Sequence, residues 1–137
     1  MKIAEINMAV GILAGIRINR ITDKRVKACL VNDYLHLRKF AKEAEAERQD
    51  LVDKFQADWA DELDAVQAFR DKGLPVVGHD AYLEAEKDAN KAISDVFARE
   101  VEVDIKPVPM DDFTTALGDE ELTLEQLAFL QEVWIVA

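Results

Sequence analysis

The feature that most constrains this chain is a stretch without proline or glycine that runs from Val26 to Lys72. Along it, the residues of one helix face follow one another at alternating steps of four and three, which is the heptad pattern of a helix that packs along a partner. That face carries Leu30, Tyr34, Leu37, Ala41, Ala44, Arg48, Leu51 and Phe55. One helix of this length would reach about 70 Å at 1.5 Å per residue. We therefore expect part of it to project or to be covered by another element.

The register of this helix changes after Phe55. Trp59 and Leu63 follow at two successive steps of four, a stutter that locally unwinds a left-handed supercoil. Because no proline or glycine occurs there, we expect the helix to continue through the stutter.

A second arm follows the turn from Gly73 to His79. Asp80 is the expected N-cap, and apolar residues from Tyr82 to Phe97 recur at helical spacing, so residues 22–99 are predicted to form an antiparallel helical hairpin. The expected fold class is mainly α: a long, coiled-coil-like hairpin with short N- and C-terminal helices and one short β-strand. We expect a single domain over residues 1–137, divided into 1–21, 22–99 and 100–137.

The N-terminal helix is expected from Ile3 to about Ile16. Gly11 and Gly15 lie four residues apart on one face, which would let another backbone approach closely. Two partners are possible, the chain's own long helix or another helix. Residues 17–21 are expected to form a connector.

A strand is predicted after the hairpin, where Val101, Val103 and Ile105 alternate with charged residues and Pro107 ends the pattern. Its partner strand is left open between residues 16–21 and the same strand of a neighbouring subunit.

Capping signals mark two helix starts. Thr22 or Asp23 is expected to cap the long helix, and Thr123 with Gln126 has the spacing of a capping box before a terminal helix. The apolar end that begins at Trp134 indicates a terminus that docks.

Charge excludes some partners. The chain has 17 basic and 28 acidic side chains, a net charge of −11, and residues 1–27 carry +4 of it against −15 for the rest. Such a balance disfavours direct nucleic-acid or membrane binding. A single cysteine, Cys29, fits a reducing compartment. We interpret the start of the chain as a mature helix of a cytoplasmic protein.

No catalytic, cofactor or metal site is predicted. Asp33 and His36 form one incomplete copy of the paired motifs of a carboxylate-bridged metal site. Cys29 lies two helical turns from His36, about 10 Å, so a packed thiol is favoured over a nucleophile. His79 is interpreted as a helix-entry residue.

Three segments resemble a family of small proteins of unknown function encoded by tailed phages and prophages. They are residues 21–27 (ITDKRVK), 100–109 (EVEVDIKPVP) and 122–127 (LTLEQL). The resemblance implies a phage or prophage origin and a protein that acts in the cytoplasm of the bacterial host cell or is virion-associated, and it supplies no catalytic residue.

Two functions are considered. The first is a non-enzymatic assembly or adaptor protein, which is expected to form a homo-oligomer and to contact a phage or host protein. The alternative is an anti-defence inhibitor whose acidic surface, with Asp58, Asp61 and Asp64, imitates a nucleic acid. The candidate interaction residues are Gly11, Gly15, Leu30, Tyr34, Leu37, Leu51, Phe55, Trp59, Val101, Val103, Ile105 and Trp134.

Overall fold

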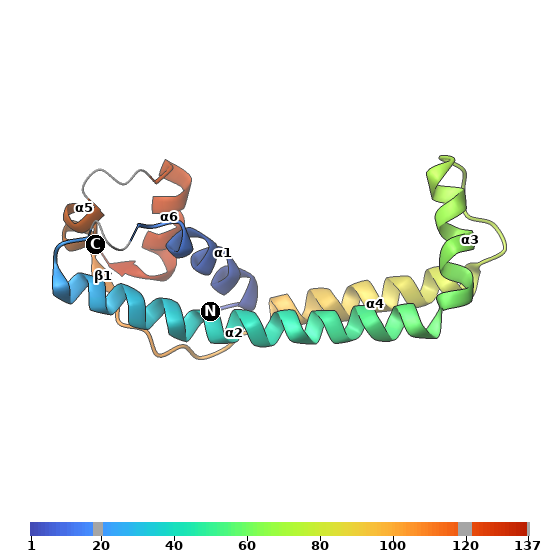
Figure 1. Cartoon of the computed structure of the whole chain (residues 1–137), viewed down its shortest axis with the longest axis horizontal. Coiled ribbons are helices and arrows are strands. Elements are labelled where there is room, and N and C mark those ends of the chain that lie inside the picture. The colour runs from blue at the N-terminus through green and yellow to red at the C-terminus, as the bar shows by residue number, and fades with distance from the viewer. Residues whose placement is uncertain (18–20, 118–121, 137) are drawn as a thin grey trace. The chain divides into compact units, whose positions relative to one another are not determined.

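The computed structural model describes residues 1–17, 21–117 and 122–136, and within them the chain is mainly helical (Figure 1), which confirms the expected class. The elements are α1 (Ile3–Ala14), α2 (Lys24–Asp58), α3 (Ala60–Asp71), α4 (Asp80–Ala98), β1 (Val108–Pro109), α5 (Met110–Leu117), α6 (Leu124–Val133) and β2 (Ile135–Val136).

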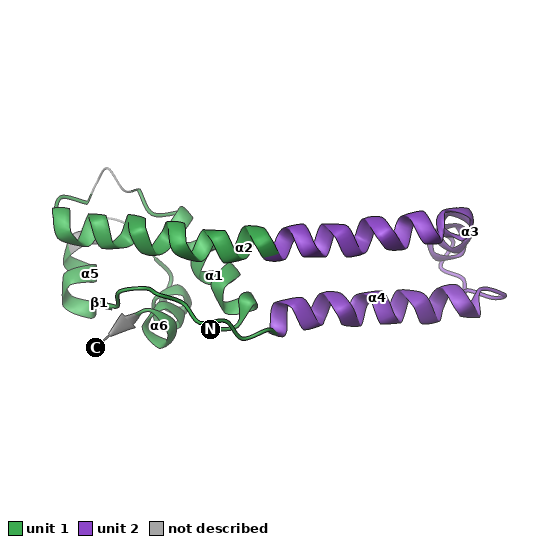
Figure 2. Ribbon diagram, turned by 90° about the horizontal axis from the view of Figure 1, so that it is seen from below, with its two compact units in different colours: residues 1–43, 99–137 green, residues 44–98 purple. Residues whose placement is uncertain are grey.

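The chain divides into two compact units (Figure 2). Unit 1 comprises Met1–Glu43 and Arg99–Ala137, and unit 2 comprises Ala44–Ala98. The assignment of one domain, with its divisions after residues 21 and 99, stays a prediction.

Unit 1 is built around the apolar faces of α1 and the first part of α2. Asp23 caps α2 as expected: its Oδ1 accepts the backbone N–H groups of Arg25 and Val26 at 2.9 and 3.2 Å. Residues 18–20 of the predicted connector lie outside the described residues. The buried apolar core of unit 1 includes Ile3, Ile6, Ala9, Leu13, Ile16, Ile21, Val26, Leu30, Leu37, Val108, Phe113, Leu130 and Trp134.

The end of the chain docks, as its apolar composition predicts. The capping box of α6 is formed, with Thr123 accepting from the Gln126 backbone N–H. After α6, β2 pairs in parallel with β1, aligning Val108 with Ile135. Trp134 is 2 % exposed.

The predicted strand at 101–105 is displaced. The regular strand β1 begins only at Val108, and before it the chain makes an isolated antiparallel bridge between Lys2 and Glu100. Residues 101–105 still alternate between half-buried apolar and exposed charged side chains. The expected alternation of side chains is therefore present, but these residues form no strand ladder. The Val101 backbone N–H bonds the Met1 carbonyl oxygen, and the Asp104 backbone N–H bonds Nε2 of His36 on α2.

In unit 2 the prediction of one uninterrupted helix to Lys72 is wrong. The helix stops at Asp58, and Trp59, with φ −120° and ψ 23°, is the N-cap of α3. Figure 1 shows α3 leaving α2 at a steep angle. The break falls at the stutter, where the indole of Trp59 turns to the Tyr82 ring at 5.9 Å between centroids. The helix therefore accommodates the change of heptad register by bending at Trp59.

The antiparallel hairpin is present, since α4 runs back beside the 44–58 part of α2 (Figures 1 and 2). The first helical residue of α4 is Asp80, so Asp80 is not the N-cap. His79 precedes it, and its backbone carbonyl oxygen accepts a hydrogen bond from the Leu83 backbone N–H at 3.1 Å. This confirms His79 as a helix-entry residue.

Candidate functional site

Three hydrogen-bond donors converge on Asp33, a residue of α2 that is 3 % exposed. The indole Nε1 of Trp134 donates to Oδ2 at 2.7 Å, and the backbone N–H of Lys106 donates to Oδ1 at 3.0 Å. The Cys29 thiol lies 3.6 Å from Oδ2. We call Cys29, Asp33 and Trp134, with the Lys106 backbone, the Asp33 cluster. It ties residues 101–106, which we call the extended segment, and the C-terminus to α2.

His36 extends the same line of contacts one turn further along α2. Its Nε2 accepts the backbone N–H of Asp104 at 2.9 Å, so that nitrogen carries no proton in this bond. Together, Asp33 and His36 satisfy alternate backbone N–H groups of residues 104 and 106. Both are occupied as acceptors, which leaves them poorly placed to act as metal ligands or general bases.

Cys29 is half-buried, and its Sγ also lies 3.3 Å from the Lys106 carbonyl oxygen. Burial raises the pKa of the thiol, and the neighbouring Asp33 carboxylate raises it further. Since the thiolate is the reactive form, this arrangement makes a weak nucleophile. The thiol lines a cavity of about 510 Å³, with Arg25 and Asp112 paired at 3.2 Å on its wall.

The seam of unit 2 is only half-covered by α4. Leu51, Phe55 and Trp59 are half-buried, although the Phe55 and Tyr82 rings meet at 5.3 Å. A cavity of about 220 Å³ remains along the hairpin, lined in part by Leu51, Phe55 and Ile93. The fully buried apolar residues of unit 2, every residue of which is described, are Ala44, Val66, Tyr82 and Val96.

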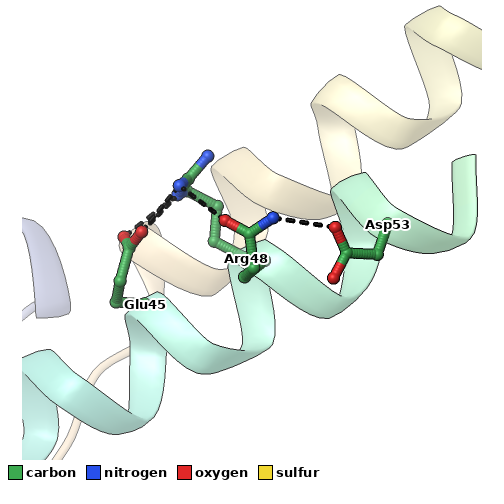
Figure 3. A network of polar contacts seen from close by, with 4 residues as sticks. Glu45, Arg48 and Asp53 are labelled. Atoms are coloured by element: carbon green, nitrogen blue, oxygen red, sulfur yellow. Dashed lines mark hydrogen bonds and ion pairs between the residues drawn. The ribbon is translucent and has the colours of Figure 1, made fainter. Parts of the chain in front are cut away.

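At the seam position of Arg48 the chain carries a polar network (Figure 3). The guanidinium bonds Glu45 at 2.6 to 3.1 Å and reaches the Gln49 side chain at 3.4 Å, which in turn donates to Asp53 at 2.8 Å. The bond from Arg48 lowers the pKa of Glu45. The network is exposed, so it interrupts the apolar seam.

One bidentate ion pair joins α3 to α4. Arg70 donates to both carboxylate oxygens of Glu86 at 2.9 and 2.6 Å, and the Tyr82 hydroxyl lies 3.5 Å from the same group. The hydrogen bonds from Arg70 lower the pKa of Glu86. Burial raises the pKa of Tyr82, and the nearby Glu86 charge adds to this.

Two apolar grooves open on unit 1. One, of about 470 Å³, lies between α1 and α6 and is lined by Met8, Gly11 and Phe129 among others. A Cβ added at Gly11 would meet nothing within 4 Å, and one at Gly15 would meet only the Ile12 carbonyl oxygen. Of the two partners considered for these glycines, the chain's own long helix is therefore wrong.

The second groove, of about 300 Å³, lies between α1 and α2. Its lining contains no charged side chain, and two of its large apolar residues are exposed, Val31 at 38 % and Leu35 at 53 %. We call it the α1–α2 groove. Its lining consists of Leu13, Ala14, Ile16, Leu30, Val31, Tyr34 and Leu35.

The predicted interaction residues are placed in different settings. Leu30, Leu37 and Trp134 are buried in the core of unit 1. The half-buried ones are Tyr34, Leu51, Phe55, Trp59, Val101, Val103 and Ile105. The prediction missed Val31 and Leu35, which lie one position beyond Leu30 and Tyr34 and form a second stripe.

Among the described residues, no group of three or more His, Cys, Asp or Glu side chains is placed to hold a metal ion. No helix in the described part of the chain is long and apolar enough to cross a bilayer. Comparisons with protein-family models, curated proteins and solved structures found no match.

Proposed function

We propose that this protein is a non-enzymatic interaction or assembly protein that self-associates through the α2–α4 hairpin of unit 2. The observation that carries the proposal is the half-buried seam at Leu51, Phe55 and Trp59, with a cavity beside it. An apolar helix stripe is stable when another element covers it. Two helices cover each other on one side only.

A second hairpin supplies the missing cover. Four helices that pack around shared apolar positions form a bundle, and a second copy brings the same seam residues to that core. The exposed Glu45–Arg48 pair interrupts the seam, so the shared apolar core would lie on the Leu51 side of it. The resemblance to phage and prophage proteins supports a role in a bacterial cell or in a particle, where a phage or host protein would be the further partner.

Oligomeric mass tests the proposal. Light scattering over a range of concentrations is expected to show association of the wild-type chain and a smaller assembly mass for Leu51→Asp. Ala46→Asp is the matched control, because Ala46 is exposed on another face of the same helix. A wild-type monomer at every concentration, or equal association of the two folded variants, contradicts the proposal.

The charge of unit 2 favours a second candidate function. This unit holds fourteen acidic and six basic side chains, a net charge of −8, and Asp58, Asp61 and Asp64 are all exposed. Such a row would imitate a nucleic-acid backbone in the basic groove of a defence nuclease. If charge reversal at these three positions leaves inhibition of candidate nucleases unchanged, mimicry is excluded.

A further inference from the structure

The α1–α2 groove is apolar inside and cationic around it. Lys27 lies one turn before Val31 on α2, and Arg38 lies three residues after Leu35, so both cations flank the exposed stripe. Residues 6–42 contain eight basic residues and two acidic ones, Asp23, which caps α2, and Asp33, which is buried in the Asp33 cluster.

Lys27 does not stabilise the helix that carries it. The first turn of α2 has no acidic residue, and positive charge near a helix N-terminus opposes the macrodipole. Among the described residues, neither Lys27 nor Arg38 makes an ion pair or a side-chain hydrogen bond. An occupant of this groove is therefore expected to be apolar at its centre and acidic at its flanks.

Unit 2 presents a loop of this chemistry. Leu74 and Val77 are 53 % and 69 % exposed, and the loop is flanked by Asp71 and Asp80 and by one cation, Lys72. We call residues 74–77 the tip loop.

The tip loop is held in shape from both sides. Gly73 and Gly78 have positive φ values of 67° and 81°. The Leu74 backbone N–H bonds the Phe69 carbonyl at 3.0 Å, the longer bond of a Schellman motif. After the loop, His79 Nδ1 lies 3.0 Å from Glu62 Oε2. A braced loop loses little conformational entropy on binding.

We propose that the tip loop of one copy of the chain inserts into the α1–α2 groove of a second copy. This contact rests on the proposed self-association and adds a second, separate interface to it. The apolar side chains of Leu74 and Val77 cover Val31 and Leu35, while acidic unit 2 faces the cations beside the groove.

The contact joins two different surfaces: exchanged reciprocally it closes a two-fold pair, and made in one direction only it is heterologous. Heterologous contacts build rings when the rotation closes and open filaments when it does not. Together with a hairpin seam between like surfaces, it would extend pairs of chains into larger assemblies.

Disulfide trapping tests the contact directly. Two proteins are prepared in a Cys29→Ser background, one with Leu35→Cys and one with Val77→Cys, and are mixed under mild oxidation. We expect a 35–77 disulfide to form faster, by about tenfold or more, than in a mixture of Leu124→Cys with Val77→Cys, because docking raises the effective concentration of the two thiols. Leu124 is 84 % exposed, so accessibility favours the control.

The rate should fall as salt is added, since screening weakens attraction between surface charges. Equal rates for the two mixtures overturn the groove contact. Equal disulfide rates would leave the proposed hairpin seam untouched, because the Leu51→Asp experiment uses chains that retain both the groove and the tip loop.

A second measurement compares assembly size. Leu35→Glu and Val77→Glu are each expected to reduce it, whereas Leu124→Glu is not. Unchanged size in the first two variants also overturns the contact.

Discussion

At the residue scale, Asp33 is a charged group inside an apolar core. A buried carboxylate is costly unless its oxygens are hydrogen-bonded, and here both oxygens accept bonds from Trp134 and the Lys106 backbone. The donors come from segments far apart in the sequence. Asp33 therefore specifies where the extended segment and the C-terminus lie on α2.

Replacing Asp33 with Asn tests this role. The amide keeps one acceptor oxygen but turns an NH₂ group toward one of the donors, so one buried donor loses its partner. Such a loss costs about 1–3 kcal/mol. Urea unfolding followed by tryptophan fluorescence should show the decrease, while Asp104→Asn, at an exposed side chain, should have little effect. Equal midpoints for both variants would show that the bonds to Asp33 are not needed for stability.

Cys29 gives a prediction of pH dependence. Because burial and then Asp33 raise the pKa of its thiol, alkylation by iodoacetamide should follow a rate–pH profile whose midpoint lies above that of an ordinary cysteine, near 8.5. Asp33→Asn should shift the midpoint downward by removing a negative charge. Rates measured between about pH 7 and 10 check both statements, and a wild-type midpoint below the ordinary value would contradict them.

At the scale of elements, the ion pair between α3 and α4 should make unit 2 sensitive to acid. Arg70 lowers the pKa of Glu86 in the folded state. The stabilisation is therefore complete above the unfolded value of 4.5 and is lost as pH falls through the folded pKa below it. Thermal unfolding of wild type and Glu86→Gln should differ at neutral pH and converge in acid. Glu84→Gln, at an exposed position of α4, is the control; a constant difference at all pH values would exclude the linkage.

The helices themselves follow from local sequence, but the bend does not. The cap at Asp23, the capping box at Thr123 and the hairpin turn each depend on neighbouring residues, and each is found as predicted. The break at Trp59 depends on a contact with Tyr82, over twenty residues later. A stutter indicates a change of phase, and tertiary contacts decide whether supercoil unwinding or bending accommodates it.

The Asp33 cluster shows the same limit from another side. The heptad pattern places Leu30 and Leu37 on one face with Tyr34 between them. Asp33 also lies between them at helical spacing, and it is more buried than Tyr34. Its donors are a backbone N–H and an indole that periodicity does not bring together. The sequence could have indicated that Asp33 is buried, because it lies at helical spacing from Leu30 and Leu37. Its hydrogen-bond donors could be identified only from the folded structure.

At the scale of the whole molecule, the net charge of −11 opposes compaction through self-repulsion. Most of it, −8, belongs to unit 2. Salt should therefore stabilise the fold while it weakens the groove contact, so the two effects have opposite signs and can be measured separately.

The Val77→Ser variant isolates the effect on the fold, because it lacks one apolar side chain of the tip loop and carries no added charge. Its urea midpoint is expected to rise as sodium chloride increases from about 0.05 to 0.5 M, over which the Debye length falls from roughly 14 to 4 Å. Urea is the appropriate denaturant since it is uncharged. A matched series with sodium sulfate at equal ionic strength separates screening from ion-specific stabilisation. If the midpoint falls with sodium chloride, favourable ion pairs such as Arg70–Glu86 outweigh the repulsion among the acidic side chains of unit 2.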